Sequence, residues 1–96
     1  MKVVWLRRSL WHLRAIKTFI SAANPTAASA LLKRIYEGAN RLATFPEMGR
    51  VGRVPGTREL PIVNSPYLII YKVGDEKVEI LAVFHGARRW PTYFPK

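Results

Sequence analysis

Two adjacent apolar segments in the second half of the chain limit its possible folds most strongly. Residues 67–73 (YLIIYKV) and 77–85 (KVEILAVFH) are rich in β-branched and aromatic residues, and a Gly-Asp-Glu turn signal separates them. The pattern predicts a hairpin of two strands. Because both strands are almost continuously apolar, we expect them at the centre of a sheet covered on both faces. Strict alternation along the second strand would place Val78, Ile80, Ala82 and Phe84 on one face, and Glu79, Leu81, Val83 and His85 on the other.

The first half of the chain shows helical spacing instead. Apolar residues recur every three or four positions over residues 10–22, with Ser9 as a candidate N-cap. A second helix is predicted from Asn24-Pro25 to about Ala43, with Asn24 as its cap and proline at its first position. Two helices joined by so short a break are expected to form an antiparallel hairpin.

Short β-branched segments at residues 2–7 and 57–62 are predicted as further strands, and residues 46–56 (PEMGRVGRVPG) as a Gly- and Pro-rich loop. The predicted order is β-α-α-β-β-β. This is an α+β fold, in which the N-terminal strand and the helical hairpin pack on a mostly antiparallel twisted sheet. Since the hairpin can cover only one face, the other face requires the C-terminal segment, a partner, or both.

The length and composition set further limits. A chain of 96 residues is the size of one domain, so residues 1–96 are expected to form a single domain. The opening MKVVWLRRSL is too short and too soon interrupted by arginines for a signal peptide or membrane span, and the chain has no cysteine. We therefore expect a cytoplasmic protein without a membrane partner. Neither a metal nor another cofactor is expected, because His12 and His85 have no cysteine or acidic neighbours.

Charge is the most pronounced property of the composition. Sixteen Lys and Arg against six Asp and Glu give a net charge of +10. Such an excess creates a positive field that favours a polyanionic or acidic partner. Glu47 and Glu59 show no spacing typical of a catalytic carboxylate pair. The candidate contacts to a target or an acidic partner lie in the loop, the following strand and the tail: Arg50, Arg53, Arg58, Arg88, Arg89 and Trp90.

Three stretches of the chain resemble one known family. They are residues 25–46 (PTAASALLKRIYEGANRLATFP), 48–60 (MGRVGRVPGTREL) and 65–91 (SPYLIIYKVGDEKVEILAVFHGARRWP). In this order and at this spacing the chain resembles the RelE/ParE superfamily of toxins, and its ParE branch more closely. The resemblance implies a toxin of a type II toxin–antitoxin system. Its cognate acidic antitoxin would wrap it with a disordered or helical segment and bury its basic surface.

The resemblance leaves two mechanisms to distinguish. RelE-like members cut mRNA on the ribosome, whereas ParE-like members inhibit DNA gyrase and catalyse nothing themselves. Cleavage of RNA by its own 2′-hydroxyl needs a base, cations on the phosphate and an acid for the leaving oxygen. RelE-like nucleases carry an arginine after the aromatic residue that corresponds to Tyr67, and that position here is Leu68. Because leucine cannot neutralise a phosphate, the sequence favours a ParE-like inhibitor of DNA gyrase without catalysis of its own.

Other interpretations stay open. A ribosome-dependent mRNA endonuclease would use Arg58, His85, Arg88 and Tyr93. The sequence favours a strand-edge arginine or an antitoxin contact over a catalytic role for Arg58. His85 is also compatible with a structural role at the end of a core strand. A third possibility is a non-toxic nucleic-acid-binding remnant of the family. The free toxin could also dimerise through its helical hairpin.

One departure from the family concerns the first helix. ParE-like first helices usually carry acidic residues between their leucines, and here His12, Arg14 and Lys17 fill such places. The helix is therefore cationic, which is expected to affect its choice of partner.

Overall fold

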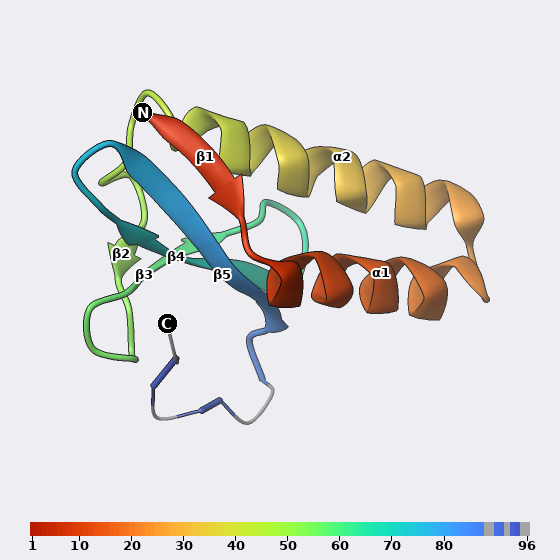
Figure 1. The fold of residues 1–96 in the computed structure, drawn as a ribbon. Helices are drawn as coiled ribbons and strands as arrows, with labels where there is room; N and C mark the ends of the chain where they lie inside the picture. Colours follow the sequence, from red (N-terminus) through yellow and green to blue (C-terminus); the bar gives the residue numbers. More distant parts are fainter. Residues whose placement is uncertain (88–89, 92, 95–96) are drawn as a thin grey trace.

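The computed structural model describes residues 1–87, 90–91 and 93–94. Two helices lie on one side of a five-stranded sheet (Figure 1). The elements in chain order are β1 (Lys2–Trp5), α1 (Arg7–Ser21), α2 (Pro25–Arg41), β2 (Arg50–Val51), β3 (Arg58–Pro61), β4 (Tyr67–Val73) and β5 (Lys77–His85). The predicted α+β fold is confirmed, with the two-residue strand β2 added inside the segment predicted as a loop.

The sheet has the strand order β1-β5-β4-β3-β2. β1 runs parallel to β5, and the other neighbours are antiparallel. The predicted hairpin of β4 and β5 therefore lies inside the sheet, as its continuous apolar character required. On the helical side, Leu13 of α1 and Ile35 of α2 pack with Ile69 of β4 and Ile80 of β5 in the main core.

The two helix starts differ from each other. Asn24 caps α2 as predicted, since its Oδ1 accepts a hydrogen bond of 3.0 Å from the N–H of Ala27. The prediction that Ser9 caps α1 is wrong. The helix begins at Arg7 with Leu6 at the N-cap position, and the Ser9 hydroxyl donates to the Leu6 carbonyl within the first turn. The Leu6 N–H still bonds to the Ile80 carbonyl at 3.1 Å, so α1 starts where the pairing of β1 with β5 ends.

A β-bulge in β5 changes which side chains share a face. Ile70 pairs with Ala82 but Tyr71 pairs with Ile80, so Leu81 is an extra residue in β5. Leu81 and Ala82 both belong to the second apolar cluster, whereas Val83 belongs to the main core on the helical side. The expected strict alternation is therefore wrong beyond Leu81, because one inserted residue reverses the side of every later one.

The second face of the sheet carries that smaller apolar cluster. Leu68, Ile70, Leu81, Ala82 and Phe84 are buried there. Trp90 and Phe94 of the C-terminal segment pack on the cluster, with their ring centres 5.5 and 5.9 Å from that of Phe84. The expectation that the C-terminal segment covers this face is confirmed.

Candidate binding surface at the basic edge

A buried carboxylate organises the edge of the sheet formed by β2 and β3. Glu59 is only 2% exposed, and Arg50 lies opposite it on β2. Nε and Nη2 of Arg50 donate to Glu59 Oε1 at 3.2 and 3.1 Å. The backbone N–H of Arg53 donates to Oε2 at 2.8 Å, and Arg53 Nε lies 3.4 Å from the same oxygen. Two of the predicted binding arginines are thus oriented by one acid, while about half of each side chain stays exposed.

The glycines of the loop permit this arrangement. A Cβ on Gly49 would lie 2.7 Å from the Glu59 carbonyl oxygen, and one on Gly52 would lie 2.8 Å from that of Thr57. Both distances are too short for a side chain, so these positions require glycine. The Gly-x-x-Gly spacing brings Arg50 and Arg53 back onto Glu59.

The C-terminal segment joins the same surface. The guanidinium carbon of Arg53 lies 3.5 Å from the centre of the Trp90 ring, a cation–π contact. Arg8 makes a longer contact of 5.2 Å with Phe94. Of the predicted tail residues, Trp90 and Tyr93 are placed here, and Arg88 and Arg89 lie outside the described residues.

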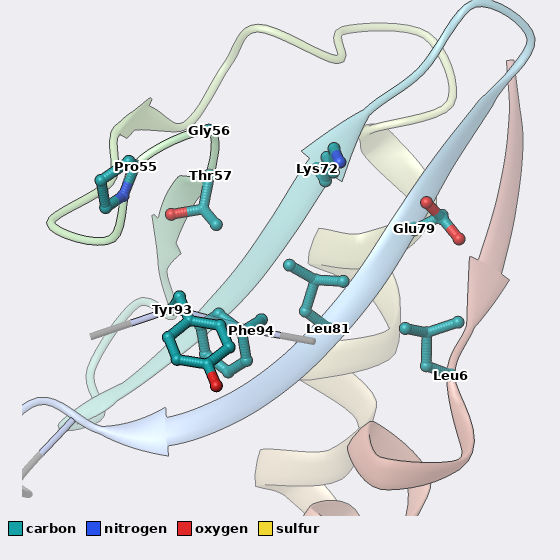
Figure 2. Close-up of a pocket in the computed structure, with 9 residues that line it drawn as sticks. All are labelled: Leu6, Pro55, Gly56, Thr57, Lys72, Glu79, Leu81, Tyr93 and Phe94. Carbon is teal, nitrogen blue, oxygen red and sulfur yellow. The ribbon is translucent and has the colours of Figure 1, made fainter. Parts of the chain in front are cut away.

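A cleft of about 410 Å³ opens beside this edge, on the sheet face opposite the helices (Figure 2). Lys72 of β4 and Leu81 of β5 form its floor, and the loop residues Pro55 to Thr57 form one wall. Tyr93 and Phe94 of the C-terminal segment line it below the loop, and Leu6 and Glu79 lie on the side toward β1. Its lining combines the charged side chains of Lys72 and Glu79 with apolar ones such as Leu6 and Leu81.

Arg58 lies at the same edge but on the helical side, opposite Tyr71 on β4. Its Nη1 donates to the Gly49 carbonyl at 2.7 Å and, at 3.4 Å, to that of Glu47. The Tyr71 hydroxyl accepts from the Gly49 N–H and donates to the Pro46 carbonyl, both at 2.8 Å. Burial raises the pKa of Tyr71 above 10.0, and the Gly49 hydrogen bond and the charge of Arg58 oppose that rise. Arg58 therefore secures the loop.

His85 lies far from Arg58. It pairs with Tyr67, four residues from Tyr71 along β4, which is about 13 Å at roughly 3.3 Å per residue. Its Nδ1 accepts from the Ala87 N–H at 3.1 Å, and its ring meets that of Tyr67 edge-on. Tyr93 lies on the opposite sheet face. Within the described part of the chain, the residues proposed for a nuclease are not brought together.

Side chains of α1 bond to the part of β5 that continues past β1. Arg8 Nε donates to the Leu81 carbonyl, and His12 Nδ1 accepts from the Val83 N–H, both at 3.2 Å. Arg8 and His12 are one helical turn apart, which matches the spacing of Leu81 and Val83 along β5. Their side chains therefore take the place of a neighbouring strand where β5 extends beyond β1. Sequence reasoning did not find this contact or the Glu59 cluster, because helical periodicity records burial and not the partners of polar groups.

Two features are absent from residues 1–87, 90–91 and 93–94, a metal-binding cluster and a membrane-spanning helix. No group of three or more His, Cys, Asp or Glu side chains is placed to hold a metal ion there. Over the same residues, no helix is long and apolar enough to cross a membrane.

Comparison with known proteins identifies the class. The family model for the ParE toxin of the type II toxin–antitoxin system parDE matches residues 3–90, so the chain belongs to this toxin family. It is 38% identical over 90 residues to the putative toxin Y4kP of Sinorhizobium fredii, covering 94% of this chain and 93% of that protein. It is 40% identical over 87 residues to toxin RelE2 of Caulobacter vibrioides, covering 91% and 97%.

The fold comparison agrees. A chain of the chromosomal ParDE toxin–antitoxin system from P. aeruginosa superposes with a TM-score of 0.77 and 25% identity, covering 88% of this chain and 95% of that one. The protein is a RelE/ParE superfamily toxin, and a cognate antitoxin is its partner.

Proposed function

We propose that this toxin inhibits DNA gyrase in the cytoplasm, without catalysis of its own, and that residues 1–96 act as one domain. Leu68 is the observation that carries the proposal. It occupies the position where the resemblance places the phosphate-binding arginine of the nucleases, and it is 6% exposed and packed with Phe84. A buried leucine in an apolar cluster leaves no cation for a scissile phosphate at this point.

The separation of Arg58 and His85 supports the same proposal. General acid–base catalysis requires the participating groups to reach one phosphodiester. Arg58 is bonded to loop carbonyls at one end of β4, and His85 lies at the other end. A protein that acts by binding needs no such convergence.

We propose that the binding surface for gyrase, or for the antitoxin, is the basic edge formed by Arg50, Arg53, Arg58 and Trp90. The proposal also includes Arg88 and Arg89, which lie outside the described residues. The charges of Arg50 and Arg53 are held in fixed positions by Glu59 and remain about half exposed. Preoriented arginines beside an aromatic ring are typical of the residues that dominate binding energies.

A supercoiling assay with purified gyrase tests the proposed target. The toxin is expected to reduce supercoiling and to accumulate linear DNA covalently linked to the enzyme, and added antitoxin is expected to reverse both effects. If gyrase is unaffected by a preparation that still arrests growth, the target is wrong.

A ribosome-dependent mRNA endonuclease is the second candidate, since one relative is named toxin RelE2 and matches over 97% of its length. In this case His85→Ala would abolish toxicity and mRNA cleavage while antitoxin binding stays nearly unchanged. Retained toxicity of His85→Ala excludes that mechanism.

A further inference from the structure

A small pocket lies between α2 and the end of β3, beside Gly38. A Cβ on Gly38 would lie 3.3 Å from Ile62 Cδ1 and 3.4 Å from Leu60 Cδ2, so the helix comes close to the strand at this point. Arg34 is one helical turn before Gly38, and Arg41 is one turn after it. The pocket beside this close approach has a volume of about 110 Å³ and is lined by Arg34, Glu37, Arg41, Pro61, Ile62 and Val63.

Arg34 contributes a buried hydrogen-bond donor to this region. Its Nε is buried and has no hydrogen-bond partner among the described residues. A donor that is removed from water without an acceptor costs free energy, and the great majority of buried polar groups in proteins have a partner. Over residues 1–87, 90–91 and 93–94, neither Arg34 nor Arg41 belongs to an ion pair. A ligand with oxygen acceptors would satisfy both side chains.

The charge of the lining favours an anion. Two positive side chains, Arg34 and Arg41, outnumber the one negative side chain, Glu37. Glu37 is three residues after Arg34 and four before Arg41, positions from which ion pairs within a helix are possible. Neither ion pair occurs in the described part of the chain. An incoming anion therefore does not have to displace an existing pair, and the carboxylate of Glu37 weakens its binding.

The size of the pocket and the number of donors favour a phosphate. A volume of about 110 Å³ admits one oxyanion group, and it lies well below the roughly 300–1,000 Å³ typical of pockets for whole small molecules. The two oxygens of a carboxylate are met by a single guanidinium group in the bidentate arrangement. A phosphate has enough oxygens to accept from two guanidinium groups at once.

We propose that Arg34 and Arg41 bind a phosphate group between α2 and the turn that follows β3. Arg34 donates its Nε–H to one phosphate oxygen, Arg41 donates to another, and Glu37 limits the affinity. The phosphate is free in solution, or it belongs to a molecule whose remainder lies outside the pocket. The site shares no residue with the basic edge. The inference therefore does not rest on gyrase as the target.

A melting experiment with inorganic phosphate tests the site. Potassium phosphate is compared with potassium chloride at equal ionic strength, since phosphate also stabilises proteins through its exclusion from their surface. Arg34→Met keeps an unbranched apolar side chain and removes the guanidinium group. At phosphate about tenfold above its Kd, the rise in Tm of the wild type is expected to exceed that of Arg34→Met by about 5–10 °C. Equal phosphate effects on the two proteins overturn the proposal.

Two further substitutions separate the site from net charge. Arg14→Met removes an exposed charge of α1 and is expected to retain the full phosphate response. Glu37→Gln removes the opposing carboxylate and is expected to tighten phosphate binding at least threefold. If Arg14→Met loses the response as Arg34→Met does, phosphate acts only through the net charge of +10, and the proposal is wrong. Weaker binding by Glu37→Gln would place the phosphate elsewhere and equally overturn it.

NMR of the wild-type protein gives a result that needs no substitution. Added phosphate is expected to shift the Nε–H signal of Arg34 and the backbone N–H signal of Val63 with one common, saturable dissociation constant. The Nε–H signal of Arg14 should stay in place. Small shifts of all arginine signals without saturation indicate an adventitious ion only, and they refute the proposal.

A short DNA duplex identifies the source of the phosphate group. If Arg34→Met weakens duplex binding and inorganic phosphate competes with the duplex, the group is a phosphodiester of nucleic acid. If both proteins bind the duplex equally while inorganic phosphate still distinguishes them, the ligand is phosphate itself or a small phosphorylated molecule. The gyrase assay is read separately: a toxin that is inactive on gyrase but binds phosphate through Arg34 refutes the proposed function alone.

Discussion

Arg53 stacks on Trp90, with its guanidinium carbon 3.5 Å from the ring centre, while its backbone N–H donates to the buried carboxylate of Glu59. One residue therefore connects the β2–β3 loop, the sheet edge and the C-terminal segment. The basic edge is therefore a folded surface and not a set of independent solvated charges. Its shape depends on the carboxylate of Glu59, which the net charge of +10 does not reveal.

Replacing Glu59 is expected to destabilise the toxin by about 1–3 kcal/mol, because Glu59→Gln removes the charge that holds two arginines. The partly exposed arginines regain water, which keeps the loss below that of a fully buried ion pair. Urea unfolding measures the change. Glu76→Gln, on an exposed turn residue, is the control and should unfold like wild type.

Removing the Tyr71 hydroxyl tests the hydrogen bonds by which β4 holds Pro46 and Gly49 of the loop. Tyr71→Phe leaves the buried Gly49 N–H without the bond of 2.8 Å that it donates, and we expect a loss of about 1–3 kcal/mol. Tyr67→Phe, at a partly exposed position on the same strand face, is the control. Comparable unfolding midpoints for the two variants would show that the hydroxyl is dispensable.

The stability of the toxin should also fall in alkali through Tyr71. Its pKa in the folded state lies above the ordinary value of 10.0, first because of burial. The unfolded chain therefore ionises this residue at lower pH than the folded one, so its contribution is complete below about pH 10 and is lost as pH rises further. Measured between pH 8 and 11, the stability difference between wild type and Tyr71→Phe should shrink with rising pH. A constant difference contradicts the prediction.

Regular patterns in the sequence predict the helices and strands well. They do not reveal a single inserted residue within a strand. The spacing of Leu13 and Ile16 and the Asn24-Pro25 signal placed both helices within a few residues. A period of two cannot record the one extra residue at Leu81, so the faces of β5 were assigned wrongly beyond it.

The candidate site was predictable only in part. The loop arginines and Trp90 do gather at one edge, but the acid that holds the arginines follows them by six and nine positions. No periodicity relates residues at such distances. The family's chemistry makes Arg58 and His85 candidate partners in catalysis, and the register of β4 with its neighbours separates them.

Restoring an arginine at position 68 tests the assignment of mechanism. Leu68 packs on Phe84 in the second apolar cluster, so Leu68→Arg would bury a charge for which that cluster offers no counter-ion. We expect a loss of about 3–5 kcal/mol, comparable to leaving one member of a buried ion pair unpaired, and no cleavage of mRNA on translating ribosomes. Leu68→Met conserves volume and polarity and should cost less than about 1.5 kcal/mol. If Leu68→Arg stays folded and cuts mRNA, the sheet face is a nuclease site lacking a single cation, and the gyrase proposal loses its main support.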